Sequence, residues 1–317
     1  MQTEQVDGTL TRWLSDAHAL EEQALVQMRR APNIAGTGDL SDAFRAHVTE
    51  TEEHEQLVDQ RLRARGGEPS AAKELVMKGG GLGFAIFAQL QPDTPGKLTA
   101  HAYSYEHLEL AWYLVLEEAA ALAGDAETGA AVRRIAGQER AMAQRLRGLF
   151  DQVVDASLPE DLDGALMGYL SDAHAIEAQS MTLLQGAVDR SGDERLSRIY
   201  ADHLAETRRQ SELLELTLKS LDSSPSMLKD AAMRMGALNW SLFFQAQPDT
   251  PVKLAAFAYA FEHLEIAGYE QLLRVAGRRA DARGTDAARR ILAEERTAAE
   301  RIAAAFPIAL RASLPRE

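Results

Sequence analysis

Glutamates and histidines recur at matched positions along this chain of 317 residues. Three segments return 156 residues later: Leu14–Glu21 as Leu170–Glu177, Gln91–Pro95 as Gln247–Pro251, and Ala102–Glu109 as Ala258–Glu265. Between Leu14 and Phe150 the first copy has fourteen glutamates, and only five meet a glutamate in the second copy. The five pairs are Glu21 with Glu177, Glu50 with Glu206, Glu106 with Glu262, Glu109 with Glu265, and Glu139 with Glu295.

Six of the eight histidines are matched in the same way: His18 with His174, His47 with His203, and His107 with His263. His18 precedes Glu21 by three residues and His47 precedes Glu50 by three, so each imidazole would share a helix face with its carboxylate. Each could be a metal ligand, a partner of a ligand, or a helix-face hydrogen-bonding group. His107 points away from Glu109 by helical geometry, which favours a structural or supporting role. His54 has no matched histidine, and we expect it at the surface.

Carboxylates that point into a helical bundle are costly to bury as bare charges, and divalent cations remove that cost. The chain has no cysteine, so any metal must be held by histidine and carboxylate. We therefore predict a site for two iron or manganese ions in each copy. The candidate ligands are Glu21, Glu50, Glu106, Glu109, Glu139, His18 and His47, with Glu177, Glu206, Glu262, Glu265, Glu295, His174 and His203. A matched glutamate could instead cap a helix, pair with arginine or lie between the copies.

Apolar residues at three- and four-residue spacing predict that helices position these side chains. In the first copy one stripe ends before Pro32, and a second starts after the expected cap Asp39 and ends at Gly66. A third helix is expected from Asp93 to about Ala123, and a fourth from about Asp125 to Val154. About 27 residues separate the second helix from the third, enough to cross a bundle end to end, with a short extra helix within Ser70–Gln89.

The fixed interval of 156 residues indicates two copies of one domain, with boundaries at 1–157 and 158–317. Four helices with one long middle crossover are typical of the ferritin-like arrangement. The predicted fold is therefore all-α, with two tandem ferritin-like four-helix bundles related by a pseudo-two-fold axis as an internal dimer. Further oligomerisation stays open.

The charge balance, 48 acidic against 34 basic residues, argues against a nucleic-acid partner. The longest apolar stretches are shorter than the roughly 20 residues of a membrane-spanning helix, so no membrane partner is expected. The first eight residues lack the basic and apolar segments of a signal peptide. We expect a cytoplasmic protein.

The sequence resembles the YciE/YciF-like, stress-associated branch of the ferritin-like superfamily. The resemblance rests on Asp16-Ala17, His47-x-x-Glu50-Thr51, Glu106-His-Leu-Glu109 followed by Tyr113, and Glu139, and it covers each copy nearly end to end. It implies a ferritin-like bundle with a carboxylate-rich centre and a link to stress responses. Two features depart from related patterns. His18 stands where the family has a glutamate, and neither Glu139-Arg-Ala-Met142 nor Glu295-Arg-Thr-Ala298 carries the Glu-x-x-His motif of ferritins and rubrerythrins.

Two functions follow as hypotheses. In the first, bound iron or manganese meets small oxidants in oxidase, peroxidase or metal-handling chemistry during stress; whether the chain is an enzyme stays open. In the second, a metal-free bundle acts as an interaction scaffold through an apolar patch. That patch comprises Phe84, Ile86 and Phe87 in the first copy and Trp240, Leu242 and Phe243 in the second. Metal storage in a shell of many subunits is a third option, which a fused pair of bundles makes harder to build.

Overall fold

The chain divides into two compact helical units. The computed structural model describes residues 2–36, 38–70, 94–227, 229–230 and 249–314. The first unit, domain 1, is built from residues up to Ser157, and the second, domain 2, runs from Leu158 to Ser313. All regular secondary structure in these described ranges is helical, which confirms the predicted all-α fold in two tandem domains. The pseudo-two-fold relation between the domains stays a prediction.

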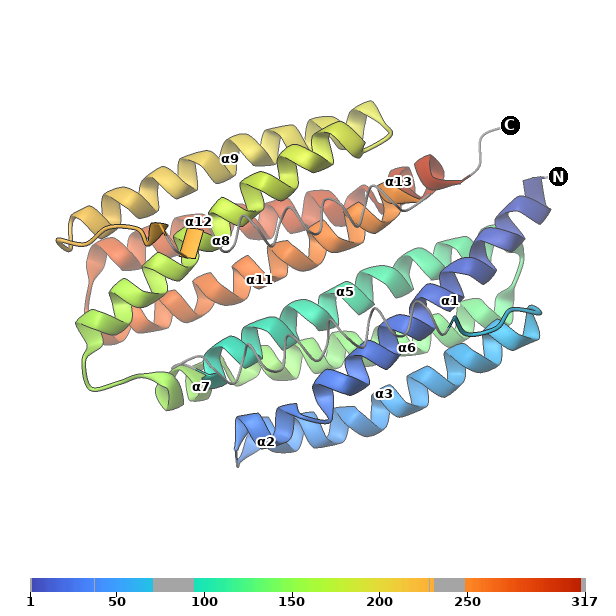
Figure 1. Ribbon diagram of the computed structural model, residues 1–317, viewed down its shortest axis with the longest axis horizontal. Helices are drawn as coiled ribbons and strands as arrows, with labels where there is room; N and C mark the ends of the chain where they lie inside the picture. The colour runs from blue at the N-terminus through green and yellow to red at the C-terminus, as the bar shows by residue number, and fades with distance from the viewer. Residues whose placement is uncertain (1, 37, 71–93, 228, 231–248, 315–317) are drawn as a thin grey trace. The chain divides into compact units, whose positions relative to one another are not determined.

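Domain 1 is a bundle of four long helices with two short ones. The long helices are α1 (Gln2–Met28), α3 (Asp39–Ala64), α5 (Thr94–Ala123) and α6 (Ala126–Gly148), and the short ones are α2 (Ala31–Ala35) and α7 (Phe150–Ser157). Helices α1 and α6 each pack against both α3 and α5. Helices α3 and α5 run in the same direction, opposite to α1 and α6 (Figure 1). The end of α3 and the start of α5 therefore lie at opposite ends of the bundle, as a crossover topology requires.

Domain 2 repeats this order with α8 (Leu162–Arg190), α9 (Glu194–Lys219), α11 (Thr250–Arg279), α12 (Ala282–Ala304) and the short α13 (Phe306–Ser313). Helices α8 and α12 each pack against both α9 and α11. The expected short helix within Ser70–Gln89 lies almost wholly outside the described residues. The apolar patch predicted in both copies, including Phe84 and Trp240, also lies outside them.

Aspartate caps explain where several helices begin. Asp125 and Asp281 are the N-caps of α6 and α12, and their carboxylates accept hydrogen bonds from the backbone N–H groups of Thr128 and Gly284. The prediction that Asp39 caps the second helix is wrong, because Asp39 is already the first residue of α3 and Gly38 precedes it as the N-cap. The predicted fourth helix is also interrupted, since α6 ends at Gly148 and α7 begins at Phe150.

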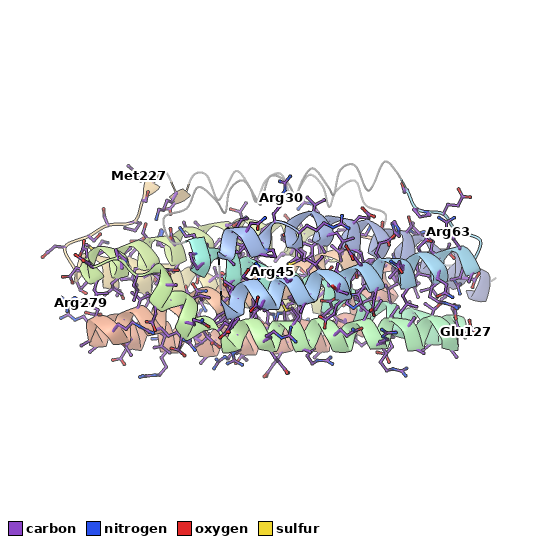
Figure 2. The ribbon with its side chains drawn as sticks, turned by 90° about the horizontal axis from the view of Figure 1, so that it is seen from below. Arg30, Arg45, Arg63, Glu127, Met227 and Arg279 are labelled. Atoms are coloured by element: carbon purple, nitrogen blue, oxygen red, sulfur yellow. The ribbon has the colours of Figure 1, made fainter. Side chains whose placement is uncertain are left out.

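The apolar stripes of the long helices meet in the bundle interior, while charged side chains project outward (Figure 2). The largest side chains that are fully buried in domain 1 include Trp13, Phe44, Tyr113, Phe150, Ile135 and Met142. The rings of Tyr103 and Phe150 lie 5.6 Å apart in domain 1, and those of Tyr259 and Phe306 lie 5.5 Å apart in domain 2. Matched aromatic contacts thus anchor the short terminal helix of each bundle to its third long helix. No described helix is long and apolar enough to cross a membrane.

Candidate metal centre

His47 on α3 reaches two carboxylates from other helices. Its Nε2 lies 3.0 Å from Glu106 Oε2 on α5 and 3.5 Å from Glu139 Oε2 on α6. All three side chains are buried. The other ring nitrogen, Nδ1, lies 3.0 Å from Oε2 of Glu50, one turn along α3. Glu50 therefore fixes the orientation in which His47 presents Nε2 to the interior.

His54 continues this polar centre toward α1. Its Nδ1 lies 2.8 Å from Glu139 Oε1 and 3.9 Å from Glu21 Oε2. The His54 side chain is only 2% exposed, so the expectation that it lies at the surface is wrong. His47 and His54 are seven residues apart, and two helical turns return the second imidazole to the inward face of the first. The comparison of the two copies missed His54 because residue 210 of the second copy is glutamine.

A tyrosine contacts this buried cluster, which comprises Glu21, His47, His54, Glu106, Glu109 and Glu139 and is called the inner group. The Tyr113 hydroxyl on α5 donates a hydrogen bond to Glu21 Oε1 on α1. The Tyr269 hydroxyl donates to Glu177 in domain 2. Tyr113 and Tyr269 are both buried, and each orients the carboxylate that its first long helix contributes.

Some predicted residues lie apart from this inner group. Glu50 is half-buried and contacts Nδ1 of His47, the ring nitrogen that faces away from Glu106 and Glu139. His18 Nε2 lies 2.8 Å from Glu55 Oε1, and these two residues form a separate group with Glu22. His107 Nδ1 donates a hydrogen bond to the Tyr103 carbonyl oxygen at 2.7 Å, within its own helix. This hydrogen bond holds the His107 ring against α5.

Domain 2 repeats the arrangement with one exchange. His203 Nε2 lies 2.9 Å from Glu262 Oε2 and 3.6 Å from Glu295 Oε2, and its Nδ1 lies 3.3 Å from Glu206. The Gln210 side-chain amide, where domain 1 has His54, donates to Glu295. His174, the counterpart of His18, lies apart from the inner group, 3.2 Å from Asp230.

Burial perturbs the protonation of these acids. Burial raises the pKa of Glu21 and Glu139 to about 7 and that of Glu177 to about 8. It also raises the pKa of Glu109, to which the charge on Glu139 adds. Burial lowers the pKa of His47, but the charge of Glu106 and hydrogen bonds to Glu106 and Glu50 outweigh it and hold this pKa well above its ordinary value. The centre therefore attracts positive charge, either protons or a cation.

The donor set fits metal cations. In domain 1, one group of ligand atoms from Glu21, His54 and Glu139 and a second group from His47, Glu106 and Glu139 each lie within 4.8 Å of one another. In domain 2, His203, Glu262, Glu265 and Glu295 form one such group. Oε1 of Glu106, Oε1 of Glu109 and Oε2 of Glu177 are buried and accept no hydrogen bond. Oxygen atoms left unsatisfied in a buried cluster are what a cation would neutralise.

Comparison with known families gives a match over nearly the whole chain. The family model described as a domain of unknown function, DUF892, matches residues 5–158 and again residues 161–313. The double match agrees with the tandem duplication. No solved structure matches the chain.

Proposed function

The chain belongs to the DUF892 family, and we propose that it is a ferritin-like protein in which each domain holds a pair of iron or manganese ions. We further propose that it belongs to the YciE/YciF-like branch and acts in the cytoplasm on small oxidants or on the metal itself during stress. The observation that carries the proposal is the position of Glu139, whose two oxygens face different imidazoles.

A carboxylate shared by two ligand groups is the geometry that a dinuclear centre needs. Glu139 Oε1 faces His54 and Glu139 Oε2 faces His47, so the two groups lie side by side and have one residue in common. Each of the four long helices contributes at least one member. Carboxylate and imidazole together suit iron and manganese, and four buried carboxylates would balance the charge of two divalent ions.

The residues around the centre have distinct tasks. Glu50 holds His47 with Nε2 inward, Tyr113 holds the Glu21 carboxylate, and the surrounding apolar side chains exclude bulk water. The acids with raised pKa values would release protons when cations bind, because only the carboxylate form is a ligand. Bound iron or manganese would supply redox or Lewis-acid chemistry.

The test is a metal count on the full chain. Protein stripped with a chelator and reloaded with Mn²⁺, or with Fe²⁺ under anaerobic conditions, should retain about two ions per domain. Glu139→Gln keeps the size of the side chain but removes the shared carboxylate, so it should lower the count from about four ions to about two per chain. Glu127→Gln on the same helix is the control, because Glu127 is 80% exposed and should leave the count unchanged.

Retention of fewer than about 0.2 ions per domain by the wild-type chain would contradict the proposal, given the expected value of about two. An unchanged count in Glu139→Gln would contradict the shared-carboxylate geometry. The alternative is a metal-free scaffold in which His47 and His54 neutralise the buried acids as cations. That alternative predicts no metal retention and no stabilisation by metal.

A further inference from the structure

The two domains differ at a pair of contacting positions beside the candidate centre. His54 of domain 1 corresponds to Gln210 of domain 2, and Gln138 corresponds to Glu294, each 156 residues later. His54 Nε2 lies 3.2 Å from Gln138 Oε1, and Gln210 Nε2 lies 3.1 Å from Glu294 Oε2. The two residues that differ between the domains are therefore hydrogen-bonded to each other in each domain, so the donor and the acceptor of this bond both differ.

In domain 1 this hydrogen bond sets the tautomer of His54. An amide oxygen only accepts, so Gln138 Oε1 places the proton on His54 Nε2. The lone pair of the neutral ring then lies on Nδ1, which faces Glu139 Oε1 at 2.8 Å and Glu21 Oε2 at 3.9 Å. An imidazole whose outer nitrogen donates to a neutral acceptor, while its inner nitrogen faces buried carboxylates, is oriented as a metal ligand.

In domain 2 the same position presents an amide N–H group, and no nitrogen lone pair, to Glu295, while the buried amide oxygen Oε1 of Gln210 has no hydrogen-bond partner. Gln210 turns its amide nitrogen inward, and this nitrogen donates to both Glu295 Oε1 and Glu294 Oε2. An amide nitrogen is a donor only, so it supports the carboxylate of Glu295 instead of joining it. His203 is therefore the only imidazole in the described group of domain 2, where domain 1 has both His47 and His54.

We propose that the two domains hold non-equivalent metal centres, with His54 as an additional nitrogen ligand that only domain 1 has. This inference rests on the proposed function. Imidazole favours Co²⁺, Zn²⁺ and Fe²⁺, whereas an all-oxygen position suits Mn²⁺ and Mg²⁺. Domain 1 binds nitrogen-preferring ions more tightly than domain 2, and the difference between the domains is smaller for Mn²⁺.

The duplication supplies a reciprocal experiment. Chelator-stripped full-length protein is titrated with Co²⁺ alone, and binding is followed by calorimetry and by the visible absorption of bound Co²⁺. The wild-type chain should show two classes of sites that differ at least about tenfold in affinity, the lower end of the effect of losing a histidine partner. H54Q/Q138E gives domain 1 the pair found in domain 2, and should move the ion that His54 binds from the tight class to the weak class. Q210H/E294Q gives domain 2 the pair found in domain 1, and should leave only the tight class and change the absorption of the second ions bound.

A single class of sites in the wild-type chain, or two classes that neither double variant changes, would overturn the inference. Failure of the proposed function looks different, because then neither the wild-type chain nor either variant binds Co²⁺ or Mn²⁺. A repeat titration with Mn²⁺ separates ligand chemistry from a change in packing, since a packing defect would weaken both ions equally. The two variants alter different domains, so a folding defect in one leaves the other informative. Far-ultraviolet circular dichroism checks folding in both.

Discussion

The hydroxyl of Tyr269 offers the sharpest single-residue test of how the buried carboxylates are held. It donates to Glu177, and Tyr269→Phe would leave that buried oxygen without its donor. Loss of one partner of a buried hydrogen bond typically costs about 1–2 kcal/mol. We expect Tyr269→Phe to lower the free energy of unfolding of metal-free domain 2 by this amount, measured by urea denaturation in the presence of a chelator.

Tyr200 in the same domain is the matched control. It is equally buried, but its hydroxyl has no hydrogen-bond partner. Tyr200→Phe removes an unsatisfied polar group, so the free energy of unfolding should stay within about 0.5 kcal/mol or rise. Equal losses in Tyr269→Phe and Tyr200→Phe would mean that the contact with Glu177 contributes nothing.

Buried acids also determine how the stability of the metal-free protein depends on pH. The pKa of Glu21 and Glu139 rises from an ordinary value of 4.5 to about 7, and that of Glu177 to about 8. At a pH between the ordinary pKa of 4.5 and the raised pKa of about 7 or 8, the folded state binds more protons than the unfolded state. The free energy of unfolding therefore falls as the pH rises through this range. We expect the melting temperature of the metal-free protein to decrease as the pH rises from about 5 to about 8. Saturating Mn²⁺ should reverse the trend, because the ion needs deprotonated ligands. A melting temperature that increases with pH in chelator would contradict the burial of these acids in protonated form.

At the level of residues, the duplication predicted most of the inner group. Glu21, Glu106, Glu109 and Glu139 were singled out because they recur, and the structure places all four in the bundle interior. The same comparison could not detect His54, because a residue that differs between the copies is removed by a test for identity. Which nitrogen of His47 faces inward also depends on contacts between helices, which a linear pattern does not contain.

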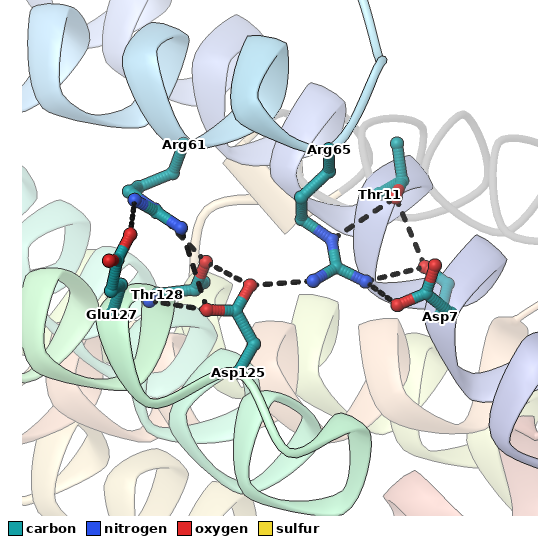
Figure 3. Close-up of polar contacts among 7 residues, drawn as sticks. All are labelled: Asp7, Thr11, Arg61, Arg65, Asp125, Glu127 and Thr128. Carbon is teal, nitrogen blue, oxygen red and sulfur yellow. Dashed lines mark hydrogen bonds and ion pairs between the residues drawn. The ribbon is translucent and has the colours of Figure 1, made fainter.

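At the level of elements, an ion network joins three helices at one end of domain 1 (Figure 3). Arg65, at the C-cap of α3, contacts Asp7 on α1 and Asp125 at the N-cap of α6. The side chains of Arg65 and Asp125 are only 9% and 13% exposed, so their contact is poorly screened by water, whereas Asp7 is 59% exposed. Arg65→Ala should destabilise domain 1 by about 2 kcal/mol, measured by urea denaturation.

Arg63 on the same helix is the control for that prediction. Its side chain projects outward (Figure 2) and is 59% exposed, and its ion pair with Asp59 lies within α3. Arg63→Ala should therefore cost less than about 1 kcal/mol. If both arginine variants were destabilised equally, the network would not be a specific link between the helices.

The residue that follows the third long helix is glycine in domain 1 and alanine in domain 2. Gly124 follows α5 with φ +70°, and its counterpart Ala280 follows α11 with φ +56°. A side chain in this left-handed conformation costs about 1 kcal/mol, and a Cβ at residue 124 would meet no neighbour. Gly124→Ala should lower the melting temperature of domain 1, and Ala280→Gly should leave that of domain 2 unchanged or raise it. A decrease in both variants would contradict the assignment of strain to this position.

Helices were predictable because their signals are local, and their interruptions were not. The stripe spacing gave the ends of α1 and α5 correctly, since proline and glycine act within a turn or two. The break between α6 and α7 has only Gly148 as a local signal, and Phe150 packs on Tyr103 of α5 directly after it. Contacts between helices of this kind are not contained in the sequence pattern.

At the level of the whole molecule, two bundles of one design differ at His54 and Gln210, and the proposed difference in metal affinity should appear in thermal unfolding. Each domain has its own core, so calorimetry of the metal-free chain should show two unfolding transitions. Arg65→Ala identifies the transition of domain 1 because it lowers only that one. Low concentrations of Co²⁺ should then shift the transition of domain 1 first, since a ligand at 100 times its dissociation constant stabilises by about 2.7 kcal/mol. Higher concentrations should move both. Simultaneous shifts at every concentration would mean that the exchange of His54 for Gln210 does not affect affinity.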